Sequence, residues 1–197
     1  MTVLLLDCDG VVVHGHPQGG RWDKDLERDL GLRADLVQTR FFKPHFRKVV
    51  LGEADLMDAL DAAWPQLETT ATPRAFVDYW FAMDSRLDGD VLAQVDAWRA
   101  VGRKAYLATV QEHHRARYLM DTLGLARHFD GIHYAAALGA AKPDRAFYER
   151  SQALLPPGEV IFLDDSLANV EAATAFGWRA HHFRSADDLR AALSRRD

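Results

Sequence analysis

Residues 3–12 read Val-Leu-Leu-Leu-Asp-Cys-Asp-Gly-Val-Val, and this stretch decides the fold that the sequence predicts. A short apolar run that stops at polar residues and a glycine is typical of a buried strand breaking into a loop. Asp7 and Asp9 are two residues apart, so in an extended chain both carboxylates point to the same side. Carboxylates this close repel one another unless a cation lies between them. The stretch therefore favours a divalent, oxygen-ligated cation such as Mg²⁺ over a turn with two exposed aspartates.

Beyond this stretch, short apolar runs alternate with helical patterns. Runs of strand length cover 3–7, 104–109, 131–135, 159–164 and 178–183, and helical patterns cover 89–101, 112–123, 144–155, 166–176 and 186–194. Strands that alternate with helices are typical of crossover units and a parallel sheet buried on both faces. The sequence thus predicts an α/β fold. We expect the last helix to pack on the sheet through Leu189, Ala192 and Leu193 rather than to form a dimer interface.

Residues 14–88 interrupt this alternation, because they contain no convincing strand and read as helices. In 55–64, Leu56, Leu60 and Trp64 share one face. Thr72 and Pro73 are an N-cap followed by proline at the first helical position, and the aromatic residues after them indicate packing between helices. The sequence therefore predicts a core of residues 1–13 and 89–197 and a helical insert at 14–88.

Composition excludes several classes of protein. The chain has 197 residues, 48% of them hydrophobic and 27% charged, which is ordinary for a globular domain. A formal net charge of -5 argues against a nucleic-acid-binding protein. No stretch approaches the ~20 apolar residues that a membrane span needs, and the first residues lack the basic region of a signal peptide. The single cysteine, Cys8, excludes an internal disulfide, so we expect a reduced, cytoplasmic compartment. Its acidic neighbours should disfavour a thiolate.

Reactive side chains follow the other predicted strands. Thr109 ends the second run, Lys142 lies in the loop after the third, and Asp164 and Asp165 end the fourth. Each alone has a plainer interpretation: a helix cap, a solvated lysine, a helix N-terminus. Because ligands of open parallel sheets bind at the carboxyl ends of the strands, we expect these groups to converge. Carboxylates suit a metal, and a hydroxyl with a lysine suits a dianion, so together they indicate phosphoryl transfer.

Four motifs in this order resemble those of the haloacid dehalogenase-like hydrolase superfamily. They are Asp7-Cys8-Asp9-Gly10-Val11, Ala108-Thr109, Lys142-Pro143 and Phe162-Leu163-Asp164-Asp165. Residues 162–169 particularly resemble the branch that contains the phosphatase domain of soluble epoxide hydrolase and bacterial sugar-phosphate phosphatases. The insert is similar in place and character to the family's small helical cap. The resemblance implies a Rossmann-like parallel core with helices on both faces and a cap inserted after the first strand.

The resemblance also implies a role for each motif residue. Asp7 would attack phosphorus and become an aspartyl phosphate, and Asp9 would protonate the leaving alcohol and then activate water. Thr109 and the backbone N–H of Val110 would bind the phosphoryl oxygens, and Lys142 would neutralise charge on the phosphate and on Asp7.

The metal site implied by the resemblance holds Mg²⁺. Its ligands would be Asp7, the backbone carbonyl of Asp9, Asp164, and Asp165 directly or through water, with Asn169 orienting Lys142. Two positions depart from the family pattern. Val110 stands where Asn is frequent, so a side-chain contact to phosphate is lost, and Ala168 stands where many relatives carry an acid, so the metal relies more on Asp165.

The function that the sequence favours is a Mg²⁺-dependent phosphatase acting on a small phosphate monoester, with a sugar phosphate as one candidate. A phosphomutase, a haloacid dehalogenase and a non-catalytic binding protein are the alternatives. Asp9 argues against the dehalogenases, which lack an acid at that position. We expect a small phosphorylated metabolite as partner, no nucleic acid or membrane, and a monomer or homodimer.

Side chains of the insert are weaker candidates for substrate contact: His14, Trp22, Phe42, Lys43 and His45. For residues 40–47, packing within the cap with a solvated basic rim is the favoured interpretation. The adjacent pairs His113-His114 and His181-His182 lack zinc-ligand spacing, so we expect them at the surface or at strand ends.

Overall fold

A parallel sheet forms the centre of the computed structural model, which describes residues 2–194. Its strand order is β3-β2-β1-β4-β5. The strands are β1 (Thr2–Leu6), β2 (Lys104–Thr109), β3 (Gly131–Tyr134), β4 (Glu159–Asp164) and β5 (Arg179–His182). β1 is the middle strand, since Leu4 pairs with Ala105 of β2 on one side and with Ile161 of β4 on the other. The predicted α/β fold and its five described strands are confirmed.

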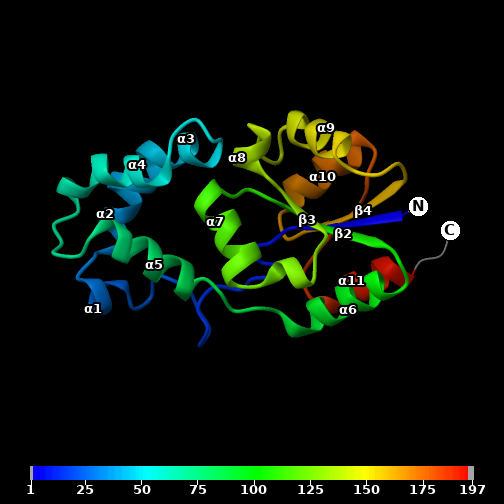
Figure 1. The fold of residues 1–197 in the computed structure, drawn as a ribbon, viewed down its shortest axis with the longest axis horizontal. Helices are drawn as coiled ribbons and strands as arrows, with labels where there is room; N and C mark the ends of the chain where they lie inside the picture. Colours follow the sequence, from blue (N-terminus) through cyan, green and yellow to red (C-terminus); the bar gives the residue numbers. More distant parts are fainter. Residues whose placement is uncertain (1, 195–197) are drawn as a thin grey trace.

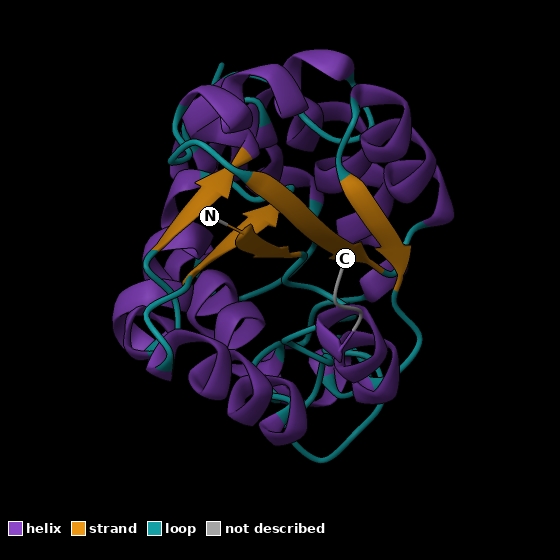
Figure 2. Cartoon of the chain, turned by 90° about the vertical axis from the view of Figure 1, so that its right-hand side faces the viewer, coloured by secondary structure: helices purple, strands orange, loops and turns teal. Residues whose placement is uncertain are grey.

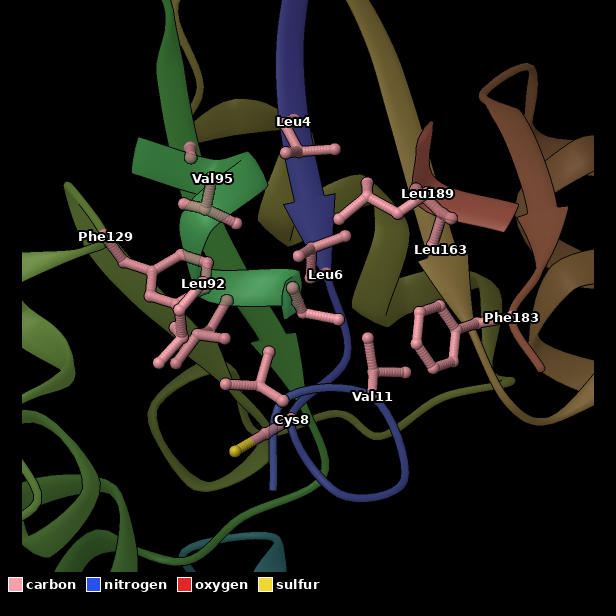
Figure 3. Packing of buried hydrophobic residues seen from close by; sticks show 14 of the residues in the cluster. Leu4, Leu6, Cys8, Val11, Leu92, Val95, Phe129, Leu163, Phe183 and Leu189 are labelled. Atoms are coloured by element: carbon pink, nitrogen blue, oxygen red, sulfur yellow. The ribbon is translucent and has the colours of Figure 1, made fainter. Parts of the chain in front are cut away.

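Helices cover both faces of this sheet (Figure 2). They are α6 (Gly89–Ala100), α7 (His113–Arg117) with a π-helical continuation (Tyr118–Thr122), α8 (Ala135–Leu138), α9 (Arg145–Ala153), α10 (Leu167–Phe176) and α11 (Ala186–Ser194), with a 3₁₀ turn at Leu125–Arg127. On one face, Leu4 and Leu6 pack with Val95 of α6 and Leu189 of α11 (Figure 3). On the other face, Val3 and Leu5 pack with residues of α9 and α10. The predicted packing of the last helix on the sheet is therefore confirmed.

The insert forms a separate group of helices to one side of the sheet (Figure 1). It contains α1 (Leu26–Leu30), α2 (Ala34–Val37), a π-helical segment (Gln38–Phe46), α3 (Arg47–Val50), α4 (Leu56–Ala63), a 3₁₀ turn (Trp64–Gln66) and α5 (Pro73–Met83). Asp55 caps α4 by accepting from the N–H of Met57, and Thr72 caps α5 by accepting from that of Ala75. As expected, the insert is helical.

The helices of the insert have a hydrophobic cluster of their own, which includes Phe41, Leu60 and Phe76. The chain enters and leaves this group through two adjacent segments, 12–15 and 85–88. The N–H of His14 donates to the carbonyl of Arg86, and the N–H of Asp88 donates to the carbonyl of Val12. These contacts support the proposed boundaries of a cap at 14–88.

The cap also contacts the core away from these two segments. A Cβ placed on Gly52, just after α3, would lie 2.5 Å from the carbonyl oxygen of Ala136 in α8, so only glycine allows this approach. His114 of α7 binds the side chain of Asp55 at 2.9 Å. Among residues 2–194, no helix is long and apolar enough to cross a membrane.

Candidate active site

The loop after β1 carries Asp7 and Asp9 on either side of Cys8. The N–H of Asp7 still donates to Leu163 of β4, at 2.9 Å, so the sheet fixes its backbone. Cys8 turns into the hydrophobic core (Figure 3). Burial, and then Asp9, raise the pKa of the Cys8 thiol, so the predicted disfavouring of a thiolate is confirmed.

Three carboxylates converge at this edge of the sheet. Oxygen atoms of Asp7, Asp164 and Asp165 all lie within 4.8 Å of one another. Gly10 permits this, because a Cβ at its position would lie 2.3 Å from Oδ2 of Asp165. The set consists of hard oxygen donors, which are the ligands that Mg²⁺ prefers. The side chains present therefore fit the expected metal.

Lys142 is the cation built into this cluster. Its buried Nζ lies 2.9 Å from Oδ1 of Asp7 and 2.5 Å from Oδ2 of Asp164. Burial alone would lower the pKa of Lys142, but Asp7 and Asp164 outweigh it and the pKa is raised. Burial raises the pKa of Asp7 to about 6, although Lys142 opposes the shift. Three carboxylates against one ammonium leave a formal charge of two negative units, which a divalent cation would balance.

The orientation of Asp164 is fixed from three directions. Besides Lys142, the N–H of Ser166 donates to Oδ1 at 2.8 Å, and Nδ2 of Asn169 donates to both oxygens at 3.0 and 3.1 Å. The family resemblance implies that Asn169 orients Lys142. In the structure its side chain binds Asp164 instead, because α10 starts directly after β4 and brings residue 169 back over the end of that strand.

Asp9 opens on a cavity of about 690 Å³ between the core and the cap. Although its own surface is accessible from that cavity, the protein around it desolvates the carboxylate, and Asp84 lies nearby. Both effects raise the pKa of Asp9, to about 7, and Arg115 opposes them. Gln111 donates from Nε2 to Oδ2 of Asp9 at 2.5 Å.

The phosphate-binding candidates lie at the same edge. Leu6 of β1 pairs with Leu107 of β2, so Thr109 sits two residues beyond that pair, at the carboxyl end of β2. Thr109 is buried, and Val110 after it is half-buried. The structure thus brings the ends of β1, β2 and β4 together, as expected for the motif residues.

The candidates from the cap divide into two groups. His14 and Trp22 line the same cavity as Asp9, whereas Phe42, Lys43 and His45 are not among its lining residues. Phe42 packs on Trp22 and Trp80, with ring centroids 6.3 and 5.2 Å apart. Lys43 is exposed. The aromatic residues of 40–47 therefore pack within the cap, as the favoured interpretation holds.

The paired histidines lie where the sequence indicates. His113 binds the hydroxyl of Tyr134, and His182, at the end of β5, binds the carbonyl of Asp165. Sequence reasoning missed Gln111, Asp84 and Arg115. Gln111 and Asp9 are 102 residues apart, so only the position of Gln111 just after Thr109 could have suggested its place.

The sequence model of the haloacid dehalogenase-like hydrolase (HAD) family matches residues 1–177. The chain belongs to this family. No curated protein matches the sequence. Solved structures do: a HAD family enzyme from Bacteroides thetaiotaomicron has a TM-score of 0.80 at 15% identity, with 99% of each chain covered. That enzyme has also been solved in complex with magnesium and inorganic phosphate, with a TM-score of 0.78 at 17% identity over 99% of this chain and 100% of that one.

A HAD phosphatase from Thermococcus onnurineus gives a TM-score of 0.62 at 22% identity, with 98% of each chain covered. A protein described as a predicted HAD-like family hydrolase from Porphyromonas gingivalis has a TM-score of 0.75 at 16% identity, with 100% of this chain and 99% of that chain covered. At these identities the likeness establishes the fold alone.

Proposed function

We propose that this HAD family hydrolase is a Mg²⁺-dependent phosphatase that hydrolyses a small phosphate monoester through an aspartyl-phosphate intermediate. The observation that carries the proposal is the cluster of Asp7, Asp164, Asp165 and Lys142 at the carboxyl edge of the sheet, together with Asp9, whose side chain lines a cavity. The magnesium and phosphate complex of the Bacteroides enzyme and the phosphatase from Thermococcus onnurineus agree with it.

Asp7 is the proposed nucleophile. One carboxylate oxygen of Asp7 would attack phosphorus. The ammonium of Lys142, 2.9 Å from Oδ1 of Asp7, holds the side chain in place. Thr109 and the N–H of Val110 would hydrogen-bond the phosphoryl oxygens as charge develops on them.

Asp9 is the proposed acid and base. Its raised pKa, about 7, suits a carboxyl group that gives a proton to the leaving alcohol and then takes one from the water that hydrolyses the aspartyl phosphate. The accessible surface of Asp9 toward the cavity lets a leaving group reach it.

The carboxylates of Asp7, Asp164 and Asp165 would hold Mg²⁺, with the carbonyl of Asp9 as a further expected ligand. When bound, Mg²⁺ supplies positive charge that offsets the charge of the phosphate. Asn169 and Ser166 keep Asp164 oriented for this task.

Two of the alternatives, a non-catalytic binding protein and a dehalogenase, fit the side chains less well. A non-catalytic binding protein needs no second aspartate at position 9, and a dehalogenase needs no acid for its leaving group. A phosphomutase would use the same residues and differ only in the acceptor of the phosphoryl group. We propose the cytoplasm as the compartment, since Cys8 is a buried free thiol.

The test is phosphate release from a panel of small phosphate monoesters, including sugar and polyol phosphates, with Mg²⁺ and with a chelator. We expect release that needs Mg²⁺ and is concentrated on a few members. Release that is equal with chelator contradicts the metal site. No release from any member contradicts the phosphatase. Transfer to a second hydroxyl of a sugar bisphosphate, faster than hydrolysis, would identify a mutase.

A further inference from the structure

Gln111 is a buried polar side chain that no step described so far uses. Only 6% of its surface is exposed. It lies two residues after Thr109, and its amide Nε2 donates to Oδ2 of Asp9 at 2.5 Å. The contact joins the loop after β2 to the loop after β1, and the two residues that make it are 102 positions apart in the chain.

Two contacts hold the backbone at Gln111 and directly after it. Its carbonyl accepts from the N–H of Ala136 in α8 at 3.1 Å. The next residue, Glu112, caps α7 by accepting from the N–H groups of His114 and Arg115. Because its own carbonyl and the following residue are fixed, the amide of Gln111 has a defined position from which to hold the Asp9 side chain.

We propose that Gln111 is a positioning residue for Asp9, the acid of the proposed phosphatase reaction, and this inference rests on that proposed function. The amide N–H needs a lone pair of Oδ2, so the proton of the carboxyl group is assigned to Oδ1. Asp9 lies beyond the last residue of β1 and opens on the cavity, so the sheet does not hold its carboxyl group. The bond from Gln111 supplies the missing orientation.

The proton balance of the step is simple. As an oxygen of Asp7 forms its bond to phosphorus, the bond from phosphorus to the ester oxygen breaks, and its electron pair stays on that oxygen. The proton on Oδ1 of Asp9 passes to the ester oxygen, which leaves as a neutral alcohol. Asp9 remains as a carboxylate whose Oδ2 still accepts from Gln111. A neutral amide donor therefore serves both protonation states.

The leaving group distinguishes this role from a structural one. An alkyl alkoxide must be protonated as it leaves, whereas p-nitrophenolate leaves without a proton. We therefore measure kcat/KM, which reports the steps up to loss of the leaving group, for p-nitrophenyl phosphate and for the alkyl phosphate that the wild-type enzyme hydrolyses fastest. The variants are Gln111→Met, which keeps the side-chain size, and Gln111→Ala.

Both variants should lose on the order of ten- to a hundredfold in kcat/KM for the alkyl ester and less than about threefold for the aryl ester. Gln152→Met is the matched control. It removes the contact between Oε1 of Gln152 and Nε1 of Trp178, 2.7 Å apart and remote from Asp9, so the ratio of the two esters should not change.

Equal losses for the two esters, or no loss in either folded variant, would overturn the positioning role while leaving the phosphatase intact. A wild-type protein that hydrolyses neither ester would end the proposed function, and the role of Gln111 with it. Thermal unfolding of each variant shows whether it is folded. If Gln111→Met does not fold, the comparison of the two esters is made with Gln111→Ala.

Discussion

Asp7 combines two properties that are rarely compatible, because it is both buried and a proposed nucleophile. Lys142 makes this possible, since its ammonium contacts Asp7 and Asp164 at once and keeps the pair of carboxylates from repelling each other. Burial still raises the pKa of Asp7 to about 6. The carboxylate is thus ionised near neutral pH but poorly solvated, which favours attack on phosphorus.

Replacing Asp7 with Asn tests the nucleophile. The amide keeps the size of the side chain, and Lys142 keeps its contact with Asp164, so the fold should survive. An amide cannot form an aspartyl phosphate, and we expect kcat to fall by at least about a thousandfold. Phosphate release and thermal unfolding are measured together, with exposed Asp121→Asn as control. A folded Asp7→Asn protein with near-normal rates excludes covalent catalysis at this residue.

Gly10 offers a second test at the same scale. Its φ of 79° lies in the left-handed region, and a Cβ there would lie 2.3 Å from Oδ2 of Asp165. Gly10→Ala should displace the Asp165 carboxylate and raise the Mg²⁺ concentration for half-maximal activity on the order of tenfold.

Gly19→Ala is the matched control for Gly10→Ala. Gly19 has a φ of 85°, and no atom lies within 4 Å of the position that a Cβ would take, so Gly19→Ala carries the backbone strain of about 1–2 kcal/mol without the collision. Both variants should lose stability, and only Gly10→Ala should change the dependence on Mg²⁺. An equal Mg²⁺ dependence in the two would show that Asp165 does not contribute to the metal site.

Among the elements, those with a regular apolar pattern could be predicted from the sequence. β1 and β4 are buried runs ended by aspartates, and the sequence predicts each within one residue of its observed bounds. In the cap, the apolar face of 55–64 predicts α4, and the N-cap Thr72 followed by Pro73 predicts α5. The helical stretch from α2 through α3 has no such signal, because it contains wide π-helical turns and Pro44.

The features that the sequence did not predict depend on contacts between segments far apart in the chain. Arg115 of α7 is a charged residue that is only 1% exposed. Its guanidinium donates to the carbonyls of Phe81 and Asp84 at the end of α5, and lies 3.7 Å from the Asp84 carboxylate. Nothing in the local pattern of α7 shows that this arginine reaches the cap.

Arg115→Met tests this contact between core and cap. The substitution keeps apolar bulk near the ring of Phe81 but leaves the buried carbonyls and Asp84 without their donor. We expect a loss of about 3 kcal/mol in the free energy of unfolding, measured with urea. Arg117→Met, exposed on the same helix, should change stability by less than about 0.5 kcal/mol. Equal losses would mean that Arg115 does not tie the two parts together.

For the whole molecule, the functional edge of the sheet depends on how core and cap are joined. The cap has its own hydrophobic cluster and meets the core through the paired segments 12–15 and 85–88, through α7, and through Gly52. The cavity at Asp9 lies between the two parts and is lined by residues of both. Its lining combines apolar surface, such as Val13 and Trp22, with polar side chains, such as Arg21 and Gln38, and the polar side chains suit a hydroxylated leaving group of the proposed phosphate monoester.

The stability of the molecule should also depend on pH, with opposing contributions. His133 of β3 is 6% exposed and binds Oγ of Ser151 at 2.6 Å, and burial lowers its pKa to about 4. Between its ordinary pKa of 6.5 and pH 4, the unfolded chain binds a proton that the folded protein does not. Stability from this group is therefore full above pH 6.5 and falls as the pH drops toward 4, by about 3 kcal/mol.

Asp7 and Asp9 act in the opposite direction, because their pKa values in the folded protein, about 6 and about 7, are above the ordinary value of 3.8. Their contribution is present at low pH and is lost as the pH rises through 6 to 7. The wild-type curve contains both effects, and a variant is needed to separate them.

His133→Gln removes the contribution of His133 to the pH dependence of stability and leaves that of Asp7 and Asp9. The difference in unfolding free energy between pH 7 and pH 4 should be smaller in His133→Gln than in the wild type by about 3 kcal/mol, as measured by urea unfolding at both pH values. Ser151→Ala removes the hydrogen-bond partner but leaves His133 buried, so it should lose stability at pH 7 and keep the wild-type pH dependence. Parallel curves for His133→Gln and the wild type would mean that the folded protein accepts a proton at His133 as readily as the unfolded chain does. In that case burial beside α9 would not be what limits the acid stability of this fold.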